Sequence, residues 1–275
     1  MTERTKNMPF TKGNVDSFQL NNEALALVLC QLRWPSLANL QNDSQLEALL
    51  PALNDKMVSD GYLVYSKTKN INYTVTPEGI TPSEDGTIHQ WSTADGKWHI
   101  SLSIQFLSLF STQYSNYQEL DSRLRAVVGI IDEIMKVPVV NRVGVRYVNR
   151  LTLPQDIARL ASMIKPEVLG YGALELPYLQ SSMNQASYQI DTDVLQVRSG
   201  LLGPNQSPDP SIEPVAGESW VLDIDASRIT SQIMNIDSIM NIVSNLSDID
   251  YDFFKSISTE EFVNRFSDEE GGLEH

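Results

Sequence analysis

Residues 137–153 read V-P-V-V-N-R-V-G-V-R-Y-V-N-R-L-T-L, the longest β-like stretch of the chain. Alternate residues of a strand point to opposite faces of its sheet, so the stretch divides by parity. One face carries mostly apolar side chains, namely Val139, Asn141, Val143, Val145, Tyr147, Asn149 and Leu151. The other face carries three arginines at intervals of four, in the set Val140, Arg142, Gly144, Arg146, Val148 and Arg150. We therefore expect a long strand with a cationic stripe on one face.

The candidate site residues are the three arginines of this stripe, Arg142, Arg146 and Arg150. Guanidinium forks suit carboxylates and phosphates, so the stripe predicts either an interface or a site for an anionic ligand. Because arginine is rarely buried unless it is paired, we favour pairing with acids of the same protein. We expect at least one arginine to meet a carboxylate from residues 209–270, and Arg146, close to Gly144, to be the buried one.

Composition indicates a globular protein with a sizeable core, since 41% of the 275 residues are hydrophobic. The single cysteine, Cys30, excludes a disulfide within the chain and a cysteine-based zinc cluster, and it indicates a reducing compartment. No stretch approaches the ~18 apolar residues of a membrane span, and the N-terminal stretch lacks the apolar core of a secretion signal. We expect a cytoplasmic protein with no membrane partner.

The net charge of −15 is concentrated towards the end of the sequence. Residues 209–275 contain 3 basic and 15 acidic side chains, whereas residues 1–150 contain 14 and 15. A phosphate backbone repels an acidic protein that lacks a segregated basic surface. Nucleic acid is therefore a poor candidate partner.

The first half, residues 20–153, predicts the order β-α-β-β-β-β-α-β. Its elements are expected at residues 23–34 (a strand, with a short helix as the alternative), 43–59 (helix), 62–67, 71–76, 87–92 and 97–108 (strands), 116–136 (helix) and 137–153 (strand). An Asp-Gly turn at residues 94–97 indicates a hairpin between Trp91 and Trp98.

The second half, residues 154–266, is predicted to be α+β with acidic C-terminal helices. Its elements are expected at residues 155–164 (helix), 166–177 (loop), 185–202 (a strand pair), 205–217 (a proline-rich connection), 220–225 (strand), 229–246 and 249–266 (helices). Residues 1–19 are predicted to be a flexible arm. Residues 267–275 are predicted to be a tail that ends in expression-tag residues.

The fold class expected from these elements is α+β, a mainly antiparallel sheet with helices packed on one side. Trp98 and Trp220 each begin a strand that is followed by a helix. Two structurally related halves are therefore a hypothesis.

Acidic pairs offer weak metal candidates. Asp223 and Asp225 lie two apart in a predicted strand, so both carboxylates would share a face and could hold a divalent cation. We favour the alternative, the solvent side of an edge strand. Asp248, Asp250 and Asp252 imitate the start of a calcium loop, but Phe253 stands where that loop needs glycine, so an acidic first turn of a helix is expected. No metal and no cofactor is expected.

The chain resembles a sporadically distributed family of uncharacterised prokaryotic proteins of about 250 residues. The resemblance rests on the N-terminal strand from Glu23-Ala24 to Arg33-Trp34-Pro35, on the later strand G-V-R-Y-V-N-R (residues 144–150) and on the segment from Phe254 to Glu261. The family supplies no activity, and its patchy occurrence is similar to that of genes in mobile-element or phage-defence neighbourhoods. The proline-rich segment at residues 204–214 and the acidic end depart from the family pattern.

The function expected from the sequence is that of a non-enzymatic binding or regulatory protein that acts through a protein partner or through self-association, for example as a homodimer. Two alternatives stay open. One is a metal-dependent hydrolase or nuclease built on Asp223 and Asp225, and the other is a sensor of a small anionic ligand or nucleotide built on the arginine stripe.

Overall fold

The computed structural model describes residues 8–12, 24–76, 79–174 and 178–266, with side chains between residues 70 and 85 left aside. The elements follow in the order β1 (Leu25–Arg33), α1 (Asp43–Ser59), β2 (Val64–Thr76), β3 (Gly79–Ser92), β4 (Trp98–Leu102), β5 (Phe106–Ser111), α2 (Tyr117–Met135), β6 (Val139–Leu151), α3 (Pro154–Ile157), α4 (Leu160–Met163), α5 (Pro166–Leu169), the 3-10 helix η1 (Gly170–Leu174), β7 (Asn184–Ile190), β8 (Asp193–Leu202), β9 (Ser219–Ile233), α6 (Ile236–Ile257) and α7 (Glu260–Phe266).

All nine strands form one antiparallel sheet in the order β2-β3-β4-β5-β1-β6-β9-β8-β7. The α+β class with a mainly antiparallel sheet is thus confirmed. Strands β1 and β6 pair at the centre, so the stretch that carries the arginine stripe lies in the middle of the sheet. A run of strands that ends beside β1 is followed by α2, and a run that ends beside β6 is followed by α6. This order is compatible with two related halves, whose kinship stays a prediction.

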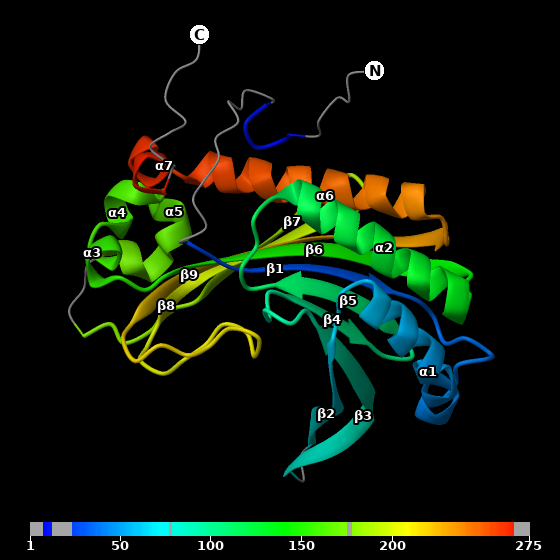
Figure 1. The fold of residues 1–275 in the computed structure, drawn as a ribbon. Coiled ribbons are helices and arrows are strands. Elements are labelled where there is room, and N and C mark those ends of the chain that lie inside the picture. Colours follow the sequence, from blue (N-terminus) through cyan, green and yellow to red (C-terminus); the bar gives the residue numbers. More distant parts are fainter. Residues whose placement is uncertain (1–7, 13–23, 77–78, 175–177, 267–275) are drawn as a thin grey trace.

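The helices cover one face of the sheet (Figure 1). Helices α2 and α6 lie across that face, α1 packs beside α2, and the paired strands β2 and β3 project from the body. The main core fills the space between them, with fully buried side chains such as Val28, Leu124, Val145 and Leu246. No helix in the described part of the chain combines the length and apolarity that a membrane span needs.

Local signals place α1 and α2 as the sequence suggests, whereas α6 begins later than expected. Each begins after an asparagine, Asn42, Asn116 or Asn235, whose side chain accepts a hydrogen bond from a backbone N–H of the first turn. Asn42 also forms a capping box with Gln45. The predicted hairpin at residues 94–97 is present, with Gly96 at φ +68°.

Several element boundaries differ from the prediction in the first half. Residues 64–76 form one strand instead of two. The stretch 97–108 is two strands, β4 and β5, because the Ser103 hydroxyl accepts from the N–H groups of Gln105 and Phe106 and turns the chain there.

In the second half, residues 155–174 fold into the short helices α3, α4, α5 and η1 instead of one helix and a loop. Strand β9 runs to Ile233 where a helix was expected from residue 229, because Ile229 pairs with Arg142 of β6. Helix α6 continues through residues 247–248. Asp248, Asp250 and Asp252 therefore lie in the second half of a helix, and the prediction of an acidic first turn was wrong.

Part of the predicted N-terminal arm is docked on α6. Buried Asp252 accepts hydrogen bonds from the N–H groups of Phe10 (2.7 Å) and Thr11 (3.1 Å) and from the Thr11 hydroxyl. The Phe10 ring packs edge-on against Tyr188 of β7 and Phe253 of α6. Residues 8–12 are called the strap below. The remaining residues of the predicted arm and the predicted tail at 267–275 lie outside the described residues.

Candidate functional site

The sheet face opposite the helices carries the arginine stripe and is partly covered by the connection between β8 and β9. This connection, residues 203–218, is called the covering loop; it lies on the side of the sheet away from α2 and α6 (Figure 1, yellow). Ile212 of the loop is buried in a second small core with Leu27, Phe110, Val148 and Val221. Both faces of β6 are therefore covered, and the arginines lie beside an apolar cluster.

Arg146 joins the sheet to the covering loop through two carboxylates. Its Nε and Nη2 donate to the two oxygens of Asp223 on β9, at 2.8 and 3.0 Å, and its Nη1 donates to Asp209 in the loop at 2.6 Å. Burial lowers the pKa of the Arg146 guanidinium, but the hydrogen bonds and charges of Asp223 and Asp209 outweigh it and hold that pKa above its ordinary value. The predicted pairing with an acid from residues 209–270 is thus present.

Arg150 holds the covering loop without any carboxylate. Its Nη1 and Nη2 donate to the backbone carbonyls of Glu213 (2.7 Å) and Gln206 (2.8 Å), and its Nε donates to the Ser219 hydroxyl (3.0 Å). Arg150 is buried, at 5% exposed, whereas Arg146 is only half-buried. Arg150, and not Arg146, is therefore the most buried arginine of the stripe. Burial lowers the pKa of Arg150.

Arg142 lies over Gly144 and beside Asp225. A Cβ on Gly144 would stand 2.7 Å from Arg142 Nη1, so the missing side chain makes room for the guanidinium. The nearest oxygen of Asp225 is 3.6 Å away, and the Gln31 amide oxygen accepts from Arg142 at 3.4 Å. Burial raises the pKa of the Asp225 carboxyl, although the positive charges of Arg142 and Arg146 partly offset this. Val140 departs from the parity pattern and is fully buried in the main core; the β6–β9 register shifts between Val140 and Arg142.

The two weak metal candidates are occupied by arginines. Asp223 accepts hydrogen bonds from Arg146 and also forms an ion pair with Arg198 of β8, whose Nη2 lies 2.6 Å from Asp223 Oδ2. Three arginines, Arg142, Arg146 and Arg198, thus face three acids, Asp209, Asp223 and Asp225. A divalent cation would have to displace guanidinium groups, which repel it, and the described residues contain no group of three or more potential ligands arranged for a metal. An external anion would likewise compete with carboxylates already in place.

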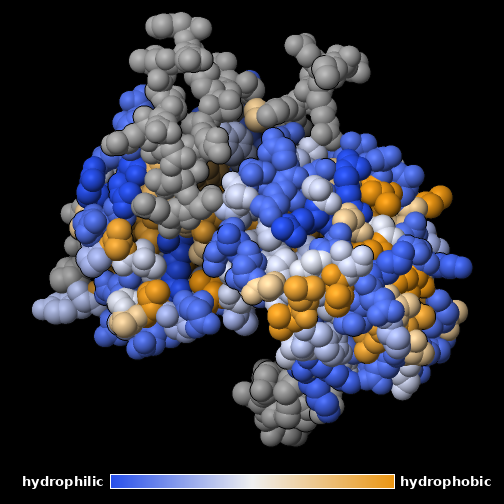
Figure 2. All heavy atoms as spheres, viewed as in Figure 1, coloured by the Kyte–Doolittle hydropathy of each residue, from blue (hydrophilic) through white to orange (hydrophobic). Residues whose placement is uncertain are grey.

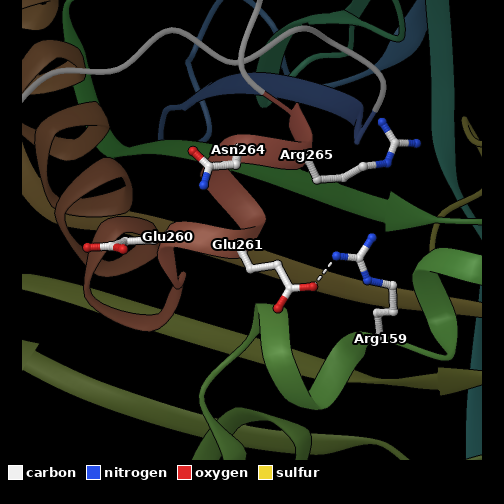
Figure 3. Close-up of a pocket in the computed structure, with 5 residues that line it drawn as sticks. All are labelled: Arg159, Glu260, Glu261, Asn264 and Arg265. Atoms are coloured by element: carbon white, nitrogen blue, oxygen red, sulfur yellow. Dashed lines mark hydrogen bonds and ion pairs between the residues drawn. The ribbon is translucent and has the colours of Figure 1, made fainter.

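A hollow of about 510 Å³ lies between α7 and the α3–α4 region (Figure 3). Arg159 pairs with Glu261 across it, and Arg265 binds both oxygens of buried Asp156, at 3.0 and 3.1 Å. Both arginines are already neutralised and Glu260 adds a further negative charge. The ion pairs around the hollow therefore hold α7 against the α3–α4 region, and no unpaired arginine among these residues is left to bind an anion.

The exposed large apolar side chains concentrate in a stretch that the sequence patterns did not single out. We call Tyr171, Leu174, Tyr178, Met183 and Tyr188 the η1–β7 surface; their exposed fractions run from 39% for Tyr188 to 97% for Tyr178. They belong to one stretch of 18 residues, and a second group of four, Val58, Leu63, Val64 and Tyr65, lies within residues 58–65. On the face seen in Figure 2, apolar side chains reach the surface in separate patches. A hollow of about 420 Å³ beside Tyr178 is lined by polar side chains such as Gln180 and Gln206.

A signal for this surface is present in the sequence. Residues 176–190, L-P-Y-L-Q-S-S-M-N-Q-A-S-Y-Q-I, contain no charged side chain, although one residue in five of the whole chain is charged. Alternation and turn patterns do not respond to a lack of charge, so they give no indication of this surface. Comparison of the chain with family models, with curated proteins and with solved structures found no match.

Proposed function

We propose that this protein is a binding or regulatory protein that acts through protein–protein contacts of its η1–β7 surface. The observation that carries the proposal is the exposure of five large apolar side chains within residues 171–188. Such groups are ordinarily removed from water when a protein has no use for them at its surface.

The chemistry of these side chains supports the proposal. Tyrosine and methionine are enriched at protein interfaces, because tyrosine buries a large rigid ring while its hydroxyl stays hydrogen-bonded, and methionine adapts its shape to a partner. Charged groups are depleted from interface centres, which matches the charge-free stretch 176–190. The arginine stripe, by contrast, is already engaged by its own protein.

Affinity capture from an extract of the source cells tests the proposal. The double variant Tyr178→Ser/Met183→Ser removes two exposed members of the surface, and Leu63→Ser/Val64→Ser is the matched control, since Leu63 and Val64 are 56% and 54% exposed elsewhere. We expect both variants to melt like the wild type. Proteins captured by the wild type should be kept by the control and lost from the double variant. Capture of the same proteins by all three would refute the proposal.

A further inference from the structure

Strand β7 ends the sheet, so one of its edges has no neighbouring strand. It pairs with β8 in an unbroken register from Asn184↔Ser199 to Ile190↔Asp193. Within the described residues, no backbone hydrogen bond reaches the other edge of β7. A row of free N–H and C=O groups of this kind is a template for another strand.

The opposite end of the sheet, β2, is protected and β7 is not. Strand β2 carries Lys67 and Lys69 in its described part, and its pairing with β3 shifts register between Lys69 and Ile71. Charged side chains, lysine above all, and bulges are the usual devices that keep an edge from pairing with another chain. Strand β7, N-Q-A-S-Y-Q-I, has no charge, no proline and no bulge. The two edges of one sheet thus differ in the way expected if only β7 accepts a partner.

The sequence of β7 is complementary to itself about Ser187. An antiparallel pairing centred there sets Ser187 opposite its own copy, Gln185 opposite Gln189 of the second chain, and Ala186 opposite Tyr188. The small Ala186 leaves room for the Tyr188 ring. The Gln189 Nε2 donates to the carbonyls of Asp191 and Asp193 of its own chain, and its amide oxygen can accept from the facing Gln185 of the second chain. Gln185, Ser187 and Gln189 are exposed, so this face is accessible in the single chain.

The net charge of the chain does not prevent a second copy from pairing at β7. Two chains of net charge −15 repel each other, but screening limits that repulsion to charges within ~8 Å at physiological salt. The charge-free β7 brings no like charges face to face. Strand pairing alone buries less than the ~1,200 Å² of a stable interface, so exposed side chains that precede β7 in the sequence, such as Tyr178 and Met183, must contribute the rest.

We propose that two copies of this chain pair through antiparallel β7 strands, with the two-fold axis at Ser187, so that two nine-stranded sheets join into one. The proposal rests on the proposed function of the η1–β7 surface and names a second copy as its partner. Because two acidic chains meet, the dimer should strengthen as salt rises, whereas a complex with a basic partner would weaken.

Disulfide trapping tests the geometry. Residues directly opposite in an antiparallel pair have Cα atoms ~4.5–5.5 Å apart, within the range of a disulfide. The only natural cysteine, Cys30, is fully buried with its pKa raised to about 12 by burial, so it should stay reduced. We expect Ser187→Cys to form a covalent dimer under mild oxidation. Ser66→Cys, at an exposed position of edge strand β2, is the matched control and should remain monomeric.

A charge exchange at the axis tests the symmetry by sedimentation velocity. Ser187→Lys and Ser187→Glu should each weaken the dimer at least about tenfold, because like charges would face each other, and their equimolar mixture should restore it. Ser66→Lys should have no effect.

Even a weak complex assembles at a protein concentration of about 100 µM. The dimer would be overturned if the wild-type chain stays monomeric up to that concentration in about 0.5 M salt. A dimer that the Ser187 variants leave unchanged would overturn the proposed pairing too. Neither result touches the proposed function, which fails only if the Tyr178→Ser/Met183→Ser variant keeps every captured protein.

Discussion

Arg146 and Arg150 face different kinds of acceptor, and this difference predicts different losses on substitution. Arg146→Ala would leave Asp223 and Asp209 in a largely buried site with one guanidinium fewer, so we expect a loss of about 3 kcal/mol in the free energy of unfolding. Arg198→Ala removes a half-exposed partner of the same Asp223 and should cost under ~1 kcal/mol. Urea denaturation of the two variants measures this; equal midpoints would contradict the buried role of Arg146.

Arg150→Ala should act on the covering loop first. It removes hydrogen bonds to the carbonyls of Gln206 and Glu213, which hold both arms of the loop. We expect faster amide hydrogen exchange through residues 203–218 and a smaller loss of global stability than in Arg146→Ala. Wild-type exchange rates in the loop would show that the Arg146–Asp209 pair and the buried Ile212 are enough to keep it in place.

Asp250 is a buried acid whose environment disfavours its charged form. It lies fully buried on α6, and neither carboxyl oxygen has a hydrogen-bond partner of ordinary geometry among the described residues. Burial, followed by the negative charges of Asp225 and Asp223, raises the pKa of Asp250 well above its ordinary value. The folded protein therefore holds a proton that the unfolded chain has lost above a pH of ~3.9. The stability due to Asp250 is complete below that pH and falls as pH rises towards the folded-state pKa.

Asp250→Asn should remove this dependence. We expect the variant to gain stability relative to the wild type as the pH is raised from about 4 to about 7, since the amide has no proton to lose in that range. Asp55→Asn, on the exposed side of α1, is the control and should track the wild type. Chemical denaturation at a series of pH values provides the readout; parallel curves for wild type and Asp250→Asn would contradict the buried acid.

At the scale of elements, the strap depends on one ring and one carboxylate. Phe10→Ala would remove the half-buried ring from its contacts with Tyr188 and Phe253, at a cost of about 2 kcal/mol, less than for a fully buried phenylalanine. Pro9→Ala changes an exposed neighbour and should be neutral. Thermal unfolding compares the two. If Phe10→Ala melts with the wild type, the strap contributes nothing to the stability of α6.

The sequence predicted the elements whose signals are local. Parity defined β6, apolar periodicity defined α1 and α2, and Asp95-Gly96 defined the hairpin. Predicted boundaries were wrong where contacts with a distant segment decide them. Ile229 lies in a strand because it pairs with β6, and α6 continues through buried aspartates such as Asp250. The spacing of the arginines in the sequence predicted the stripe, but it could not predict which groups the arginines bind. Arg150 binds carbonyls more than 50 residues away, and no side-chain pattern marks a carbonyl.

At the scale of the whole molecule, β1 and β6 form a central pair of the sheet, although about 105 residues separate the end of one from the start of the other. We expect a chain divided between Lys136 and Val137 to yield two fragments that are insoluble alone, because each exposes the apolar edge of a central strand. Co-expressed, they should co-elute as one complex, since the cut lies between α2 and β6 and breaks no strand. A fragment that is soluble and unfolds cooperatively by itself would show that its half is an independent domain.

The central place of β1 has a consequence for the time in which the chain can fold. Cys30 of β1 pairs with Val145 of β6, about 115 residues later, and on its other side with Leu109 of β5. A ribosome that adds about 5–20 residues per second needs roughly 6–23 s to synthesise the interval between β1 and β6. Throughout that interval the apolar strand β1 lacks β6, one of its two neighbours in the sheet. Such distant pairing makes for slow folding, and the nascent chain should depend on chaperones that shield β1 until β6 has emerged.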